Sequence, residues 1–310
     1  MLAIKTLPHK SIIFRRVARL MGTQFEISVV GDNPHWADDR IDDAIAEINR
    51  VEKLLSAFND DSAVNEINRS AGIKPVKTNG EVFRLIERSM QISELTHGAF
   101  DITYCTMDVD APEFDTPAET KVKRIISYQN VVLDAGAQTV FLKEKGMRLG
   151  FGANSKGYAA DRAKYILQMN GVSSGVINAD GDLLAWGAQP DNDPWTIATA
   201  DPDQKALLFA NVNISNMAVA TSVNTEKHTS ILNKGINAID AKNGFPVSEI
   251  KSVSIISPSA ELADAMATPV MLIGVNAGLY LINQLNQMAC IIIDDHDRIY
   301  TSKDVSIASR

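Results

Sequence analysis

Most of the strand-like segments in the second half of the chain follow one another too closely for a crossover helix to fit between them. These segments are residues 176–178, 183–186, 196–199, 207–212 and 217–221. Parallel strands need a connection of roughly a dozen or more residues, whereas antiparallel strands need only a short turn. The spacing therefore predicts an α+β fold, with mostly antiparallel or mixed sheets packed against helices.

The first half of the chain predicts one half-buried strand and two amphipathic helices. Phe25, Ile27 and Val29 alternate with polar residues, as in a strand with one buried face. Apolar residues then recur at spacings of three and four over residues 38–56 and 81–95, as on one face of a helix. Further elements are expected at residues 131–133, 139–142, 158–169, 253–256, 277–288, 291–293 and 299–300, and in a helix around residue 261.

Composition places the chain among globular proteins of ordinary content. It has 310 residues, of which 45% are hydrophobic and 22% charged, with a net charge of −8. Nucleic acid is not expected as a partner, because binding to a phosphate backbone needs a basic surface. No linker, repeat or low-complexity segment divides the chain. Residues 1–310 are therefore predicted to form a single domain, with residues 1–20 as an N-terminal extension.

No targeting or membrane segment is apparent in the sequence. The basic first twenty residues hold only a short apolar run, with no cleavage site or lipid-attachment cysteine after it. No run approaches the ~18 apolar residues of a membrane-spanning helix. The chain as written is expected in the cytoplasm, or in the periplasm if a leader has been removed.

The cysteines and histidines do not predict a zinc site. Cys105 and Cys290 have neither metal-binding nor CxxC spacing, and each is expected to be a buried thiol. A disulfide between them stays open at this point. The five histidines are scattered along the chain, with no pair at helical spacing.

A glycine-rich turn at residues 148–157 leads into the helix predicted at 158–169. Glycines allow backbone N–H groups to approach a ligand closely, and a helix N-terminus carries partial positive charge, so the turn is a candidate anion site. It matches neither of the common phosphate-binding motifs, since Gly150-x-Gly152 lacks a third glycine and Gly157 is followed by Tyr158. An ordinary strand-to-helix turn is the alternative interpretation.

About a hundred residues later, Asp264 and Thr268 stand four apart on a predicted helix, which places both side chains on one face. Carboxylate and hydroxyl oxygens suit Mg²⁺ or Ca²⁺. A divalent cation between this helix and the glycine turn would make an acidic element compatible with a bound phosphate. The alternative is that Asp264 is only an acid in the first turns of a helix.

These two elements belong to a set of five segments that resemble the ApbE family, the FAD:protein FMN transferases. The segments are residues 21–23, 56–68, 98–103, 156–161 and 263–268, in the family's order. The resemblance implies an ApbE-like fold with the active site in a central cleft. It also implies transfer of the FMN moiety of FAD to a threonine of a target flavoprotein, with release of AMP.

The resemblance implies a role for individual residues as well. Asp264 and Thr268 would be catalytic and, together with the carbonyl of Ala153, would ligate Mg²⁺. Lys156 would lie near the phosphates or the flavin. The remaining flavin contacts would be Met21, Phe58, Ala99, Phe100 and Asp101. The chain carries no acceptor motif of its own, so the acceptor would be another protein.

Several positions depart from the family pattern: Gly150 replaces a usual acid, Asp180-Gly181 a glycine pair, Val223 a glycine and Asn237 a histidine, and Pro269 directly follows Thr268. A proline inside a helix removes one N–H and predicts a kink. Two alternatives stay open: a Mg-dependent FAD pyrophosphatase, in which water replaces the acceptor, or a catalytically impaired flavin-binding protein, which the departures at positions 150, 223 and 237 favour. Residues 171–175 also fit the G-x-S-x-G pattern of hydrolases, but a helix is predicted before them and a strand after, the reverse of the required order.

Overall fold

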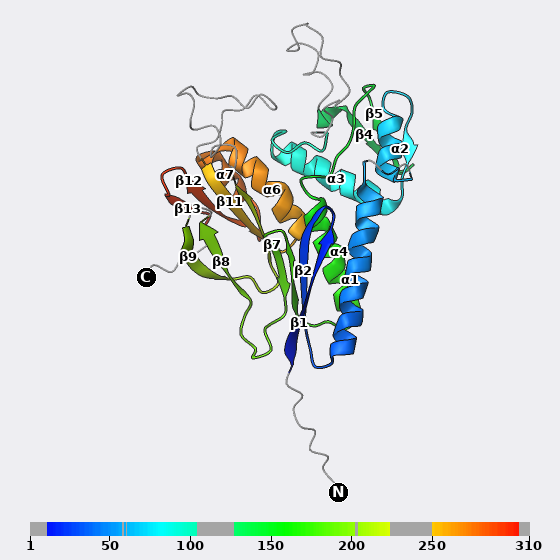
Figure 1. Cartoon of the computed structure of the whole chain (residues 1–310). Helices are drawn as coiled ribbons and strands as arrows, with labels where there is room; N and C mark the ends of the chain where they lie inside the picture. Colours follow the sequence, from blue (N-terminus) through cyan, green and yellow to red (C-terminus); the bar gives the residue numbers. More distant parts are fainter. Residues whose placement is uncertain are drawn as a thin grey trace, which may run out of the picture.

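The computed structural model describes residues 11–57, 59, 61–103, 127–201, 204–223 and 250–303 (Figure 1). Its helices are α1 (Pro34–Leu55), α2 (Ala63–Arg69), α3 (Gly80–Leu95), α4 (Ser155–Met169), α6 (Ala260–Ile273) and α7 (Val275–Ile282). Its strands are β1 (Ile12–Leu20), β2 (Thr23–Gly31), β3 (Val76–Lys77), β4 (Val131–Asp134), β5 (Thr139–Leu142), β6 (Gly175–Ala179), β7 (Asp182–Trp186), β8 (Thr196–Asp201), β9 (Gln204–Asn213), β10 (Ala218–Val223), β11 (Ile250–Ser257), β12 (Ala289–Asp294) and β13 (Ile299–Thr301).

Eight of these strands form one sheet, in the order β1-β2-β6-β7-β10-β11-β12-β13. A three-stranded sheet, β3-β5-β4, and the β8-β9 hairpin complete the described strands. Every pairing between these strands is antiparallel. The predicted α+β class with antiparallel sheets is confirmed. Of the short connections seen in the sequence, those between β6 and β7 and between β8 and β9 are hairpin turns, whereas those between β7 and β8 and between β9 and β10 lead from one sheet to another.

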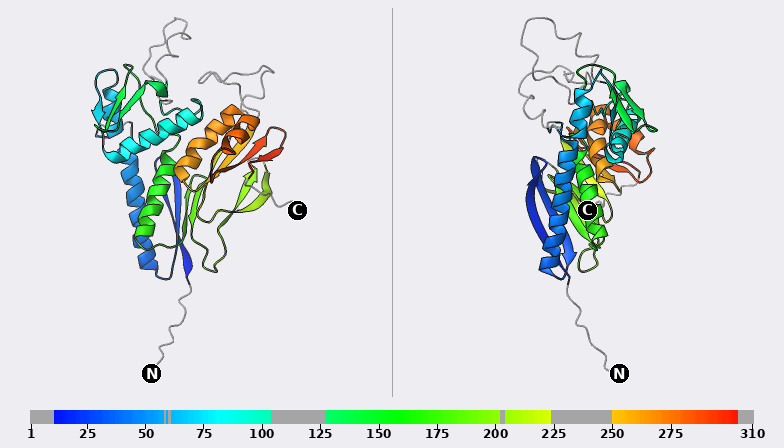
Figure 2. Two further views of the ribbon diagram at one scale, coloured as in Figure 1. Left: turned by 180° about the vertical axis from the view of Figure 1, so that it is seen from behind. Right: turned by 90° about the vertical axis from the view of Figure 1, so that its right-hand side faces the viewer.

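Helices α1, α4 and α6 cover the large sheet. Figure 2 shows α1 and α4 side by side, with α6 next to α4, and all three helices contact strands of the sheet. Helix α3 and the small sheet lie at one end of this layer. Because α4 stands between α1 and α6, it contacts a helix on each side. That position brings the glycine-rich turn at the start of α4 to the α6 helix.

The local patterns explain why these elements form. In β2, Phe25, Ile27 and Val29 are at most 1% exposed, as their alternation predicts. Helix α1 begins where the Asn33 side chain accepts a hydrogen bond from the backbone N–H of Trp36 and where a proline opens the first turn. Its buried face carries the predicted apolar residues. Helix α4 ends at Met169, before a glycine with positive φ, as expected.

Two expectations differ from the structure. Residues 1–20 were assigned to an extension, but Ile12–Leu20 form β1, which pairs along its whole length with β2. Its exposed face alternates arginines with apolar residues, so the segment does not show the polar-apolar alternation of an ordinary half-buried strand. The last helix was expected over 277–288, whereas α7 ends at Ile282 and Gln287 has a φ of 60°, which a continuing helix does not allow.

Other predictions made from the sequence can be located in the fold. Cys290 is a buried free thiol, while Cys105 lies outside the described residues. Helix α4 precedes the G-x-S-x-G segment and β6 follows it, which confirms the order that excludes a nucleophile elbow. Within the described ranges, no helix combines the length and the apolar character that crossing a bilayer requires.

Candidate active site

A cavity of about 210 Å³ lies where the turn before α4 meets α6, β7 and β10. The lining residues that matter here are Ala153, Lys156, Asp182, Ser222, Asp264 and Thr268. The sequence predicts that four of these residues contact a metal ion or a phosphate: Ala153, Lys156, Asp264 and Thr268. The structure brings all four together at one cavity, although the two segments that carry them are about a hundred residues apart in the chain.

Asp264 is the central acid of this cavity. Its Oδ2 accepts a hydrogen bond of 3.1 Å from the backbone N–H of Gly157, in the first turn of α4. Burial raises the pKa of Asp264, and the nearby negative charge of Asp182 raises it further. The Gly157 N–H and the Lys156 ammonium oppose these effects, but the pKa still rises to about 7.

Asp182, the first residue of β7, is a second acid at the cavity, and the sequence had not identified it. Its Oδ2 lies 3.5 Å from the Lys156 ammonium, and its Oδ1 accepts a hydrogen bond of 3.0 Å from the backbone N–H of Thr221. Burial raises the pKa of Asp182 despite these two partners. Two largely buried carboxylates therefore face one lysine, which leaves an excess of negative charge at the cavity.

This charge distribution fits a divalent cation with oxygen ligands. Asp264 and Thr268 present a carboxylate and a hydroxyl one helical turn apart, and Ala153 lines the same cavity. Mg²⁺ in proteins is commonly held by one or two carboxylates and completes its shell with waters and substrate phosphates. The Thr268 hydroxyl forms a hydrogen bond of 2.9 Å with the Ser222 hydroxyl, which also lines the cavity.

The residues expected at the flavin lie in two places. Met21 occupies the tight turn between β1 and β2 with a φ of 52°, and its backbone N–H donates to Glu52 Oε2 at 3.1 Å. Phe100 is 4% exposed and belongs to the hydrophobic core, and Ala99 precedes it in the turn after α3. Phe58 lies outside the described residues. Met21, Ala99 and Phe100 are not among the residues that line the cavity at Asp264.

Asp101 has a set of hydrogen-bond partners that was not foreseen. Its Oδ1 accepts from the backbone N–H and the hydroxyl of Thr103, at 2.8 and 2.7 Å. Its Oδ2 accepts from the backbone N–H of Tyr128 at 2.9 Å. These bonds join the segment after α3 to the segment that precedes β4. They give Asp101 a local structural role.

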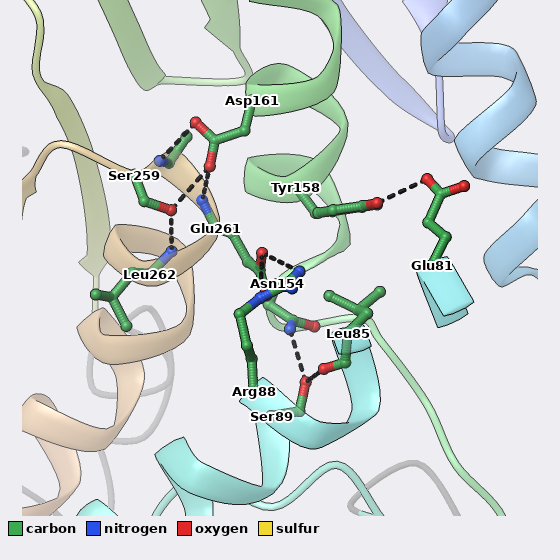
Figure 3. A network of polar contacts seen from close by, with 11 residues as sticks. Glu81, Leu85, Arg88, Ser89, Asn154, Tyr158, Asp161, Ser259, Glu261 and Leu262 are labelled. Carbon is green, nitrogen blue, oxygen red and sulfur yellow. Dashed lines mark hydrogen bonds and ion pairs between the residues drawn. The ribbon is translucent and has the colours of Figure 1, made fainter. Parts of the chain in front are cut away.

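The sequence also did not predict a network of charged residues that connects α3, α4 and α6 (Figure 3). Asp161 of α4 accepts hydrogen bonds from the first turn of α6, and Arg88 of α3 forms a two-pronged ion pair with Glu261 of α6. The sequence noted Asp161 only as part of the segment 156–161 that resembles the ApbE family. Arg88 and Glu261 are 173 residues apart, and no local pattern links them.

The departures from the family pattern can be placed for all but Asn237, which lies outside the described residues. Asp180 and Gly181 form the β6–β7 turn with φ values of 59° and 101°, and aspartate tolerates this conformation better than most residues. Gly150 donates its backbone N–H to the carbonyl of Ile102 at 2.8 Å. Helix α6 continues through Pro269 to Ile273, with Thr268 still at the cavity.

Comparison with known proteins identifies the family of this chain. Residues 21–292 match the ApbE family. A FAD:protein FMN transferase of Klebsiella pneumoniae (strain 342) is 29% identical over 266 residues, which cover 82% of each chain. One of Treponema pallidum (strain Nichols) is 26% identical over 325 aligned positions, with 94% of this chain and 87% of the relative covered.

Solved structures show the same fold. The flavin transferase ApbE from Vibrio cholerae superposes with a TM-score of 0.80 at 20% identity, covering 94% of this chain and 98% of that one. The apo form of the flavinyl transferase ApbE from Pseudomonas stutzeri gives a TM-score of 0.76 at 24% identity, covering 97% and 98%. The chain belongs to the ApbE family, and the relatives it matches carry the name of a transferase.

Proposed function

We propose that this protein is an FAD:protein FMN transferase that moves the FMN moiety of FAD to a threonine of a target flavoprotein in a Mg²⁺-dependent reaction. The observation that carries the proposal is the meeting of Asp264 and Thr268 with the glycine-rich turn at one polar cavity. The names of the relatives supply the substrate class. A new bond forms between the threonine oxygen and the FMN phosphorus, and the hydroxyl proton of the threonine is released. The bond from the FMN phosphorus to the bridging oxygen breaks, and AMP leaves with that oxygen and its electron pair.

The chain's own residues have separable tasks in this proposal. Asp264, Thr268 and the Ala153 carbonyl hold Mg²⁺, which when bound neutralises the negative charge of the diphosphate. Lys156, kept at the cavity by Asp182, adds a positive charge on the phosphate side. The proposed flavin contacts are Met21, Phe58, Ala99, Phe100 and Asp101.

The test is a measurement of AMP release. The protein is incubated with FAD and Mg²⁺, with and without a peptide that carries a threonine acceptor motif, and AMP is quantified. AMP that appears only with the peptide, together with flavin-labelled peptide, is the expected result. AMP without peptide would instead indicate FAD hydrolysis, and bound flavin without AMP would indicate a binding protein.

Replacement of Asp264 by alanine tests the metal assignment within the same assay. AMP release is expected to fall to background in Asp264→Ala, as it should in the wild-type protein treated with a chelator. Asp39→Ala is the matched control, because Asp39 is an exposed acid on α1. Unchanged turnover in Asp264→Ala would exclude the role given to this carboxylate.

A further inference from the structure

Helices α4 and α6 each place a carboxylate at the beginning of the other. The backbone N–H of Gly157, near the start of α4, donates to Asp264 of α6. In return, Asp161 of α4 accepts from the backbone N–H groups of Ala260 and Glu261, both at 3.0 Å. The hydroxyl of Ser259, the N-cap residue of α6, donates to the same carboxylate at 2.8 Å.

These bonds satisfy groups that an α-helix leaves open. The first backbone N–H groups of a helix have no partner within the helix, and a negative charge near them is favourable. Asp161 supplies both a charge and two acceptors at this end of α6, in addition to the cap provided by Ser259. The start of α6 is therefore fixed to a defined point on α4, about one helical turn after the glycine-rich turn.

A second anchor holds the same turn of α6 from another side. Arg88 of α3 donates to both carboxylate oxygens of Glu261, with distances from 2.7 to 3.1 Å (Figure 3). Glu261 is 7% exposed, whereas the Arg88 side chain is 41% exposed, so the carboxylate is buried and the guanidinium reaches the surface. The first turn of α6 is thus attached to α4 and α3, and Asp264 follows on the next turn.

We infer that Asp161 is a positioning residue for the metal site. It fixes the first turn of α6 against α4. In this way it sets the distance from Asp264 and Thr268 on α6 to the glycine-rich turn and the start of α4, where Ala153 and Lys156 lie. This inference rests on the proposed metal role of Asp264 and Thr268, but not on the transfer reaction. Residues that orient the ligands of a metal typically change its affinity by about 10- to 100-fold when they are replaced.

The variant that tests the inference is Asp161→Asn. The amide keeps the size of the side chain but removes its charge. Its NH₂ group cannot accept a hydrogen bond, so it loses at least one of the bonds that Asp161 receives from the first turn of α6. The matched control is Glu47→Gln. Glu47 of α1 accepts a hydrogen bond from Arg162 of α4 at 2.9 Å, so it anchors α4 to α1 and makes no contact of this kind with α6. Both variants replace a partly buried, ion-paired or hydrogen-bonded carboxylate by an amide.

The measurement is Mn²⁺ binding, followed through the electron paramagnetic resonance signal of the free ion with FAD present. Mn²⁺ is a suitable probe because it accepts the same oxygen ligands as Mg²⁺. Asp161→Asn is expected to raise the Mn²⁺ dissociation constant by about 10- to 100-fold. Glu47→Gln is expected to lower the urea midpoint of unfolding while leaving the Mn²⁺ dissociation constant essentially unchanged.

Equal Mn²⁺ affinity in Asp161→Asn and wild type would overturn the inference, as would equal weakening in both variants or a wild-type protein that binds no Mn²⁺. If Asp161→Asn does not fold, Ser259→Ala carries the test, with an expected several-fold loss of affinity. A wild-type protein that binds Mn²⁺ through Asp264 but releases no AMP would contradict the transfer reaction alone. The positioning role of Asp161 would stand in that case.

Discussion

Replacement of Gly157 by alanine is expected to force α4 and α6 apart. Gly157 lies inside α4, where alanine would ordinarily be the better helix former by about 1 kcal/mol. Here, however, an added Cβ would lie 2.2 Å from the carbonyl oxygen of Ala260 and 2.8 Å from the backbone nitrogen of Glu261. Both atoms belong to the backbone of α6, so no side-chain rotation relieves the contact.

The size of the effect follows from this geometry. An ordinary contact at Cβ begins near 3.4 Å, so the Ala260 oxygen at 2.2 Å would have to move by about 1.2 Å. Overpacking of an interior typically costs about 1–3 kcal/mol, and a clash with backbone belongs at the upper end of that range. After the gain in helix propensity of about 1 kcal/mol is subtracted, a net loss of about 2 kcal/mol in the free energy of unfolding is expected.

Urea unfolding measures this loss as a lower midpoint with an unchanged slope. The matched control is Gly80→Ala at the start of α3, where the nearest atom to an added Cβ is the guanidinium Nη1 of Arg84, at 3.2 Å. That side chain can move away, so no comparable loss is expected. A Gly157→Ala protein as stable as wild type, with unchanged Mn²⁺ affinity, would refute the close approach of the two helices.

Two further predictions concern stability. Tyr158→Phe removes the hydrogen bond of 2.7 Å from the tyrosine hydroxyl to Glu81 Oε1 and is expected to lower the free energy of unfolding by about 1 kcal/mol in urea. An unchanged free energy of unfolding would contradict a stabilising role for this bond. Burial alone would raise the pKa of Asp294, but hydrogen bonds from the following turn, including Arg298 and Tyr300, lower it to about 2. This folded-state pKa lies below the usual value near 3.9, so the ionised Asp294 stabilises the folded protein. Its contribution to the free energy of unfolding is complete above about pH 5 and is lost as the pH falls toward 2. Asp294→Asn should flatten the pH dependence of the unfolding free energy in that window, and an unchanged profile would contradict the assignment.

The elements predicted from the sequence are those whose residues carry a local periodic pattern. Strand β2 and helix α1 each bury one regular face, and the short connections between consecutive strands from β6 to β10 predicted the antiparallel class. Strand β1 was not predicted, because its exposed face mixes arginine with isoleucine and valine, and these charges suggested a basic extension. The partner that makes it a strand, β2, is visible only in the fold.

The candidate site likewise contains residues that a local sequence pattern predicts and residues whose role depends on contacts between distant segments. Asp264 and Thr268 were found because a spacing of four on one helix is a local property, and the glycine turn is a short motif. Asp182 was missed because it begins an ordinary strand, and its importance comes from Lys156, which lies on another element. The pair of Arg88 and Glu261 depends on the packing of α3 against α6, which neither segment encodes by itself.

The segment 156–161 shows how one short motif serves such a long-range contact. Gly157 and Asp161 are four residues apart in α4, so both face α6. The missing side chain of Gly157 lets the backbones approach, and only at that distance does the Asp161 carboxylate reach the N–H groups of Ala260 and Glu261. The proposed cation site has ligands on two elements and so needs a fixed distance between them. Gly157 lets α4 and α6 approach each other, and Asp161 holds the start of α6 at that distance.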